Sequence, residues 1–289
     1  MPGIIGYFIM NSDKKLAIGS ALASMMSVQG GASIAKYLFH LLGPAGAVTL
    51  RVGLAGIMLF AAMRPKVWKF TREQWLCVLF YGVSVGLMNL TFYYGIQRVP
   101  LGIGVAVEFI GPLSVAIYAS RKITDFLWVL LAAAGIICIV PWQGGGDLWG
   151  YIFVSIAGVM WASYILSAGK LSGKMKNTEA VACGMCVATL IVLPFALASG
   201  DLFKLNGRLL LMGLGVAVFS SALPFTLDLF TIKRLQAKVY SVLQSLHPVF
   251  AALSGLIFLK EQLSFLQWLA VFFIVTASAG AALTSPVKK

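Results

Sequence analysis

The chain has 289 residues, of which 60% are hydrophobic and only 11% are charged, and its mean hydropathy is +0.93. A soluble domain carries about 25% charged residues, so this composition excludes a soluble globular protein and indicates an integral membrane protein. The net charge of +13 does not indicate nucleic-acid binding, because the basic residues lie between apolar runs and form no continuous stripe.

A helix needs about 20 mostly apolar residues to cross a bilayer, and ten runs in this chain meet that requirement. Strands of a membrane barrel would be about ten residues long with alternating polarity, so helices are expected. The predicted spans are residues 16–38, 45–63, 74–97, 100–120, 124–141, 148–169, 179–199, 208–231, 238–258 and 264–283. The expected fold class is an all-α membrane protein with ten transmembrane helices.

The positions of Lys and Arg predict that both termini are cytoplasmic. In that orientation, sixteen of the 22 basic residues lie in cytoplasmic loops and tails and four lie outside, while Lys36 and Arg51 lie within spans. Cytoplasmic loops of membrane proteins carry an excess of basic residues, so this distribution favours an even number of spans.

The two halves of the chain carry a weak internal repeat. Residues 96–122 align with residues 232–258 at a constant offset of 136. The alignment pairs Arg98 with Arg234, Glu108 with Gln244 and Pro112 with Pro248. Two halves of five spans each would have opposite orientations, and many transporters are built from such inverted repeats with the substrate site between them. A chance likeness of two proline-containing apolar helices is the alternative.

These patterns divide the chain into five segments. They are an N-terminal tail (1–15), a first five-helix repeat (16–141), a linker (142–147), a second five-helix repeat (148–285) and a C-terminal tail (286–289). The four cysteines all lie inside apolar runs, and the CGMC sequence at 183–186 lacks a second ligand pair. We therefore expect the cysteines to pack, with no metal site and no cofactor.

Glu108 is the only charged residue between Leu101 and Ser120. A carboxylate at the centre of a spanning helix costs about 2.5–3.5 kcal/mol on insertion scales, so its presence indicates a role. Pro112, four residues later, removes a backbone hydrogen bond and frees a carbonyl group. The two residues predict a polar notch in which Glu108 binds a cargo amine or a proton. A structural carboxylate paired with another helix is the alternative.

Other polar residues also lie within the apolar runs. His247 precedes Pro248, which is a second predicted helix break like Pro112. The imidazole could accept a proton near neutral pH, although a structural histidine is an equal alternative. Arg51 and Lys36 could bind the carboxylate of an amino acid or could extend to the membrane interface. The neutral and aromatic candidates for lining a central cavity are Gln29, Asn89, Tyr93, Trp161, Tyr164 and Gln244, for which hydrogen bonding between helices or packing is the alternative.

Most of residues 15–285 resemble the drug/metabolite transporter superfamily, in particular its EamA-type bacterial members and, among these, threonine/homoserine exporters. The resemblance is carried by SVQGGASIAKYLF (27–39), VTLRVGLAGIML (48–59), LFYGVSVGLMNLTFYYGIQRVPLGIGVAVEFIGPLSVAIYASRK (79–122), WASYILS (161–167) and SSALPFTLDLFTIKRL (220–235). It implies that Asp228 faces the cavity, although the nearby Lys233 and Arg234 favour an interfacial role. One position departs from the pattern, since His247 stands where such exporters carry a glutamate.

The resulting hypothesis is a secondary transporter of the bacterial inner membrane that exports threonine, homoserine or similar metabolites. Glu108 would bind the ammonium group of the cargo and Arg51 its carboxylate. Exchange for protons, carried by Glu108 or His247, would drive export, because the sequence has no ATP-binding motif. The expected partners are the cargo, protons and membrane lipid, with no nucleic acid; a monomer is the simplest expectation for the oligomeric state, which the sequence leaves open.

Three alternatives remain. An exporter of the same fold could carry aromatic amino acids, purines or cationic drugs. A channel is a second alternative, which single-channel conductance would distinguish from slow exchange. An enzyme is not expected, because the chain has only two histidines and no constellation of catalytic groups at one depth.

Overall fold

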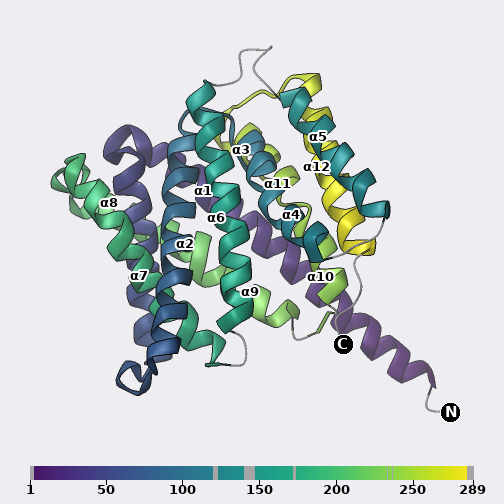
Figure 1. Ribbon diagram of the computed structural model, residues 1–289, viewed down its shortest axis with the longest axis horizontal. Helices are drawn as coiled ribbons and strands as arrows, with labels where there is room; N and C mark the ends of the chain where they lie inside the picture. Colours follow the sequence, from purple (N-terminus) through teal and green to yellow (C-terminus); the bar gives the residue numbers. More distant parts are fainter. Residues whose placement is uncertain are drawn as a thin grey trace.

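The computed structural model describes residues 3–119, 123–139, 147–171, 174–232, 234–235 and 237–284, and every secondary-structure element within these ranges is a helix. The helices are α1 (Gly3–Met63), α2 (Arg72–Ile96), α3 (Leu101–Glu108), α4 (Ile110–Ala119), α5 (Ile123–Ile139), α6 (Leu148–Leu171), α7 (Asn177–Ala198), α8 (Gly207–Ala217), α9 (Leu223–Ile232), α10 (Ala237–Gln244), α11 (His247–Leu259) and α12 (Phe265–Thr284). Two 3₁₀ turns, η1 (Val67–Lys69) and η2 (Asp201–Lys204), and a π-helical segment, η3 (Val218–Ala222), complete the order (Figure 1).

The all-helical fold class is confirmed for the described residues. Among these, five stretches are both long and apolar enough to cross a bilayer: Lys15–Met63, Arg72–Ile96, Leu148–Ala168, Thr178–Ala198 and Val242–Leu259. The count of ten spans and the placement of both termini in the cytoplasm stay predictions. The predicted linker lies mostly outside the described residues, and the C-terminal tail lies entirely outside them.

The first two predicted spans are joined by a kink, where the sequence predicted a connecting loop. Helix α1 begins at Gly3, inside the predicted N-terminal tail, and continues to a break at Gly43, whose φ of 68° and ψ of 166° suit only glycine. Pro44 follows and can begin a helix without its missing N–H. The buried Asp201 carboxylate accepts a hydrogen bond from the Gly46 N–H at 3.2 Å, which satisfies a free donor in the first turn after the kink.

Polar side chains also fix the starts of helices along the chain. Thr71 and Gln74 form a reciprocal capping box at the start of α2, and the Asn206 side chain accepts from Leu209 N–H at the start of α8. These capping residues lie between apolar runs, so they fix the residue at which α2 and α8 begin.

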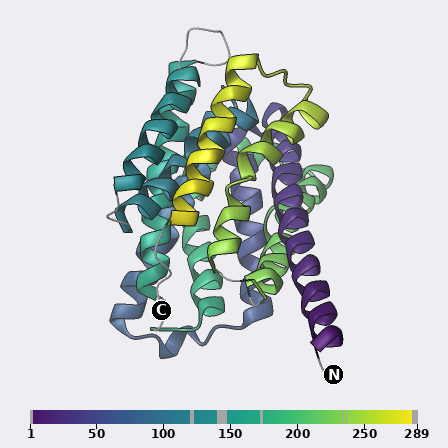
Figure 2. The same ribbon diagram turned by 90° about the vertical axis from the view of Figure 1, so that its right-hand side faces the viewer.

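The predicted repeats interleave in space. Helix α2 from the first half packs along α6 and α7 from the second, α5 packs along α12, and α3 lies against α11 (Figures 1 and 2). The two sequence halves are therefore not separate bodies, and any movement that opens the molecule must separate bundles that contain helices from both.

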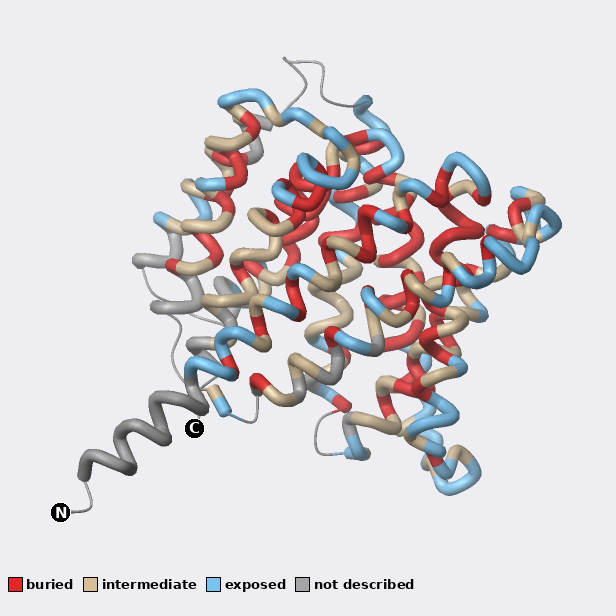
Figure 3. Tube along the Cα trace, turned by 180° about the vertical axis from the view of Figure 1, so that it is seen from behind, coloured by how far each residue is buried: buried red, intermediate tan, exposed pale blue. Residues whose placement is uncertain are grey.

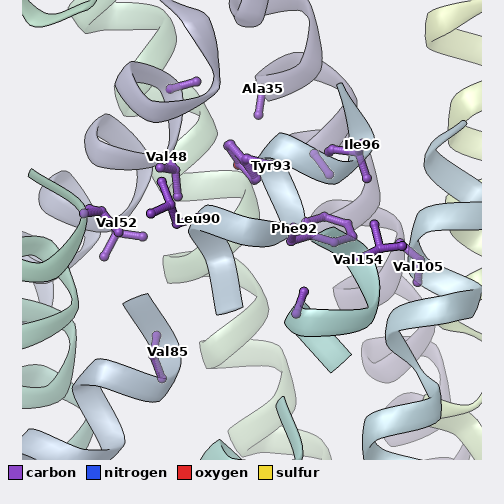
Figure 4. Close-up of a cluster of buried hydrophobic side chains, with 14 of the residues drawn as sticks. Ala35, Val48, Val52, Val85, Leu90, Phe92, Tyr93, Ile96, Val105 and Val154 are labelled. Atoms are coloured by element: carbon purple, nitrogen blue, oxygen red, sulfur yellow. The ribbon is translucent and has the colours of Figure 1, made fainter. Parts of the chain in front are cut away.

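A buried apolar core lies where α1, α2, α3 and α6 meet. Tyr93 and Ile96 of α2 are fully buried there, and Figure 4 shows them beside Ala35 of α1, with Val154 of α6 near Phe92. Exposed positions follow the outer faces and the loops (Figure 3), and they include large apolar side chains such as Tyr118 and Phe265. An apolar outer surface suits contact with lipid.

The closest approach of α6 to the α3–α4 junction depends on Gly158. A Cβ atom at this position would lie 2.9 Å from the Glu108 carbonyl oxygen and 3.4 Å from its Cα. We expect Gly158→Ala to lower the melting temperature of the purified protein, since overpacking costs about 1–3 kcal/mol. Gly215→Ala in α8 is the matched control, because nothing lies within 4 Å of its added Cβ. Equal melting temperatures for the two variants would contradict this close packing.

Candidate functional site

Two broken helices meet near the centre of the molecule. Helix α3 ends at Glu108, and α4 starts at Ile110. Pro112 lacks the N–H that would bond the Glu108 carbonyl, so the break follows from the sequence. Helices α10 and α11 repeat this pattern: α10 ends at Gln244, four residues before Pro248.

The side chain of Glu108 is buried, with 6% relative exposure. Within the described part of the chain, its carboxylate has no hydrogen-bond donor and no ion-pair partner at contact distance. The nearest electrostatic influence comes from the Arg51 guanidinium. A buried carboxylate without contacts is costly, which is typical of a group reserved for a ligand or a proton.

Arg51 extends from α1 toward the same region but is held by neutral groups. Its Nη1 donates to the Tyr93 hydroxyl at 3.3 Å and its Nη2 to the Ser220 carbonyl oxygen at 3.5 Å. The guanidinium carbon also lies 5.6 Å from the centre of the Tyr93 ring. Ser220 belongs to η3, and π-helical segments of this kind recur at functional sites. Because its partners are neutral, the Arg51 guanidinium keeps its positive charge available for an anion, and it lies within electrostatic range of Glu108.

His247 is brought to the site from the second half of the chain. Its Nδ1 lies 3.2 Å from Nε2 of the buried Gln29 on α1. Its ring lies 6.4 Å from the ring of Phe109, the residue that follows Glu108. Phe109 also makes an edge contact at 5.3 Å with Trp161 of α6, so aromatic rings form one wall of the site.

We call Gln29, Arg51, Tyr93, Glu108 and His247 the central polar cluster. These five predicted site residues come from α1, α2, α3 and α11, and Trp161 borders them through Phe109. Tyr93 is fully buried, Gln29 and Glu108 are nearly so, and Arg51 and His247 are half-buried, so most of the cluster lies inside the protein in this conformation.

A second polar group forms around Asp228 of α9. Its carboxylate interacts with the hydroxyl groups of Ser24 and Tyr240, and Tyr240 also accepts a hydrogen bond from Gln244. Tyr164 lies within electrostatic range of Asp228, and its ring packs 5.2 Å from that of Tyr81. Asp228 is therefore grouped with Gln244, through Tyr240, and with Tyr164, and within the described residues no hydrogen bond or ion pair joins these three to the central cluster.

Two predicted site residues have other local partners. Lys36 donates to Glu261 at 2.5 Å and to the Val99 carbonyl oxygen at 2.9 Å, and the same Glu261 accepts from the Leu101 N–H at 2.8 Å. This ion pair ties α1 and the start of α3 to the segment after α11. The Asn89 amide bonds the Val85 carbonyl one turn earlier in its own helix.

Sequence reasoning did not find Glu261, Ser220 and Phe109. Glu261 lies outside the predicted spans, so only the folded structure reveals that it is half-buried and paired with the distant Lys36. The hydroxyl of Ser220 is buried and has no hydrogen-bond partner among the described residues. Phe109 could have been found, because it directly follows the only carboxylate in its apolar run.

Comparison with known proteins agrees with the sequence resemblance. Residues 15–140 and 148–283 each match the EamA-like transporter family. The chain is 44% identical over 273 residues to the threonine/homoserine exporter RhtA of Escherichia coli strain K12, covering 93% of this chain and 92% of that protein. The RhtA of Salmonella typhimurium strain LT2 is 43% identical over 91% of this chain and 90% of its own length.

A more distant relative is an uncharacterized transporter of Archaeoglobus fulgidus, with 26% identity over 68% of this chain and 71% of that protein. A protein of known crystal structure shares the fold with a TM-score of 0.57 at 17% identity, covering 95% of this chain and 98% of that chain.

Proposed function

Because this chain belongs to the EamA-like transporter family, we propose that it exports small amino acids, with threonine and homoserine as the best candidates, by exchange for protons. It is a multi-pass protein of the bacterial inner membrane, and its relatives are named as exporters or transporters. No catalytic activity and no bound cofactor are part of the proposal, and the proton gradient is the energy source.

The proposed topology has ten spans in two inverted repeats of residues 16–141 and 148–285, with both termini in the cytoplasm. Its support is the family match, which occurs twice over nearly these ranges. A second support is that Ala237 and Gln244, the bounds of α10, lie 136 residues after Leu101 and Glu108, the bounds of α3. Two helices broken at equivalent positions are typical of transporters in which the cargo site lies between repeats.

The single observation that carries the proposed mechanism is the separation of Glu108 from Arg51. Each charge is buried or half-buried, the two interact electrostatically, and they do not form an ion pair. A zwitterionic amino acid could bind between them with its ammonium at Glu108 and its carboxylate at Arg51, which would satisfy both groups. Lys36 is held by Glu261, so Arg51 alone is assigned to the carboxylate.

Protons enter the proposed cycle at Glu108. A carboxylate binds an ammonium only when it is ionised, so protonation of Glu108 releases the cargo and deprotonation allows the next cargo to bind. Since the Glu108 side chain is buried in this conformation, access to it from each side requires the surrounding helices to separate in turn. The cargo and the proton would then bind to the Glu108 carboxylate at different stages of the cycle, which couples export of the cargo to entry of the proton.

One observation favours the alternative cargo. Phe109 follows Glu108 and its ring contacts those of Trp161 and His247, and an aromatic wall suits flat or cationic compounds. Gln29 and the Tyr93 hydroxyl favour small polar cargo on the other sides. An exporter of aromatic amino acids, purines or cationic drugs therefore stays the second candidate.

Counterflow of labelled threonine into proteoliposomes tests the function. We expect unlabelled threonine and homoserine inside the vesicles to drive uptake of the label, and a proton gradient to stimulate it. Vesicles loaded with tryptophan, adenine or a quaternary ammonium compound should give little uptake, and protein-free vesicles give the background. Stronger uptake with the aromatic or cationic compounds than with threonine and homoserine would contradict the assignment and support the alternative.

A further inference from the structure

The side-chain amide of Gln29 joins α1 to the first residue of α11. Its Nε2 lies 3.2 Å from His247 Nδ1 and 3.4 Å from the His247 carbonyl oxygen. A carbonyl oxygen can only accept, so the atom that faces both groups must be the NH₂ donor; the reverse orientation would place two oxygens against each other. The Gln29 backbone is held as well, because its own carbonyl accepts from Ser254 at 3.0 Å.

This arrangement assigns the proton on the imidazole ring. An Nδ1 that accepts from an amide carries no hydrogen, so the proton of the neutral ring is on Nε2. Protonation of Nδ1 would direct an N–H group against the NH₂ group of Gln29, which opposes formation of the imidazolium.

We propose that Gln29 is a positioning residue that holds His247 as the neutral Nε2–H tautomer, so that His247 donates a hydrogen bond to an oxygen of the cargo and does not carry the proton. The inference rests on the proposed function, because it assigns two roles within the same site. Proton exchange then belongs to Glu108, and the imidazole helps to orient the cargo.

The surroundings of the ring agree with a donor role. Among the described residues, Nε2 has no hydrogen-bond partner, and the ring is half-buried beside Phe109. Helices α1 and α3 pack most extensively on α11. From Lys15 onward, their titratable and charged groups are Glu108 of α3, Arg51 and Lys36 of α1, and the exposed Lys15, Tyr37 and His40 of α1. Helix α12, which also packs on α11, has no titratable residue. Lys36 is neutralised by Glu261, and Arg51 is held by Tyr93.

Nitrogen-15 NMR of histidine-labelled protein tests the tautomer directly. The chain has only two histidines, and His40→Gln removes the exposed one, so the remaining signals belong to His247. We expect a non-protonated Nδ1 and a protonated Nε2 that persist across about pH 5 to 8, the range in which an unperturbed histidine titrates. A protonated Nδ1 within this range in the wild-type background would overturn the proposal.

Two substitutions at Gln29 separate positioning from packing. In Gln29→Leu the signals should change to a mixture of tautomers, and in Gln29→Glu they should show a protonated Nδ1, since a carboxylate accepts where the amide donates. Identical histidine spectra in the wild type and Gln29→Leu would overturn the proposal. The exposed Gln97→Leu is the matched control and should leave the spectrum unchanged.

Transport supplies the second measurement. We expect Gln29→Leu to raise the KM for threonine by about twofold or more, because only the share of the protein with the Nε2–H tautomer would bind with full affinity, without moving the pH midpoint of transport. An unchanged KM together with an altered tautomer would overturn the role in cargo binding. Wild-type protein that shows the expected spectrum but no counterflow of threonine would instead refute the proposed function, so the two failures are distinguishable.

Discussion

Glu108→Gln should lower threonine counterflow by at least about 100-fold, because removing one partner of a buried charge pair costs about 3–5 kcal/mol and each 1.4 kcal/mol is a factor of ten. The substituted amide keeps the size of the side chain but cannot pair with an ammonium group or exchange a proton. The measurement is the initial rate of labelled threonine uptake into loaded proteoliposomes at equal protein content.

The same variant distinguishes a functional Glu108 from a structural one. The carboxylate has no partner in the described part of the chain, so neutralising it should leave the melting temperature unchanged or raise it. Glu73→Gln is the matched control, since Glu73 pairs with Lys174 on the surface and should have little effect on transport. Normal counterflow by folded Glu108→Gln protein would remove Glu108 from the mechanism, and a sharp loss of stability would indicate a structural role.

Arg51→Met should produce a loss of transport of similar size, at least about 100-fold, for the complementary reason that the cargo carboxylate would be buried without a cation. Methionine fills much of the same volume, and the Tyr93 hydroxyl and the Ser220 carbonyl each lose one hydrogen bond from the guanidinium. The measurement is again the rate of threonine counterflow, with binding of threonine to the detergent-solubilised protein as the second readout.

Arg208→Met provides the control for Arg51→Met. Arg208 is exposed at the start of α8, so its loss removes one positive charge of the chain without touching the central polar cluster. Counterflow within about twofold of the wild type is expected for this variant, as for most exposed substitutions. If Arg208→Met and Arg51→Met reduced transport equally, the loss would reflect net charge or insertion and not recognition of the carboxylate.

The central polar cluster explains why the two broken helices are retained. A helix break at the depth of the membrane leaves carbonyl groups without partners, which is tolerated only where protein or water satisfies them. In this chain one break places Glu108 and Phe109 at the site, and the other places His247 there. Arg51 and Gln29 reach the same region from the two arms of α1 on either side of its Gly43 kink. The site therefore depends on three interruptions of regular helix.

Local signals in the sequence were enough to predict the breaks and the main charge. Glu108 stood out because it is alone in an apolar run, and Pro112 and Pro248 predicted interruptions because proline cannot donate the backbone bond. The connection at Gly43 was harder to predict. The short interruption in hydropathy there is typical of an ordinary loop, but the positive φ of Gly43 joins two helical segments through a kink. Hydropathy predicts which residues lie within the membrane, but it does not predict the backbone conformation that connects them.

The features that could not be predicted from the sequence are contacts between residues that are far apart in the chain. Lys36 was predicted either to bind a carboxylate of the cargo or to extend to the membrane interface. Its ion pair with Glu261 joins residues that are far apart in the chain and belong to different predicted repeats. The interleaving of α2 with α6 and α7 has the same origin, because helix packing depends on which faces complement one another and not on sequence order. For the same reason Asp228 could not be assigned to its group with Ser24 and Tyr240 before the fold was known.

Threonine and threoninol, which lacks the carboxylate, provide the most direct test of the central claim that Arg51 and Glu108 bind opposite ends of one zwitterion. The measurement is competition by each compound against labelled threonine in wild-type, Arg51→Met and Glu108→Gln proteins. The wild type should prefer threonine strongly, Arg51→Met should lose that preference, and residual binding by Glu108→Gln should retain it. An equal preference for threonine in the wild type and Arg51→Met would contradict the account, because the carboxylate would then be recognised elsewhere.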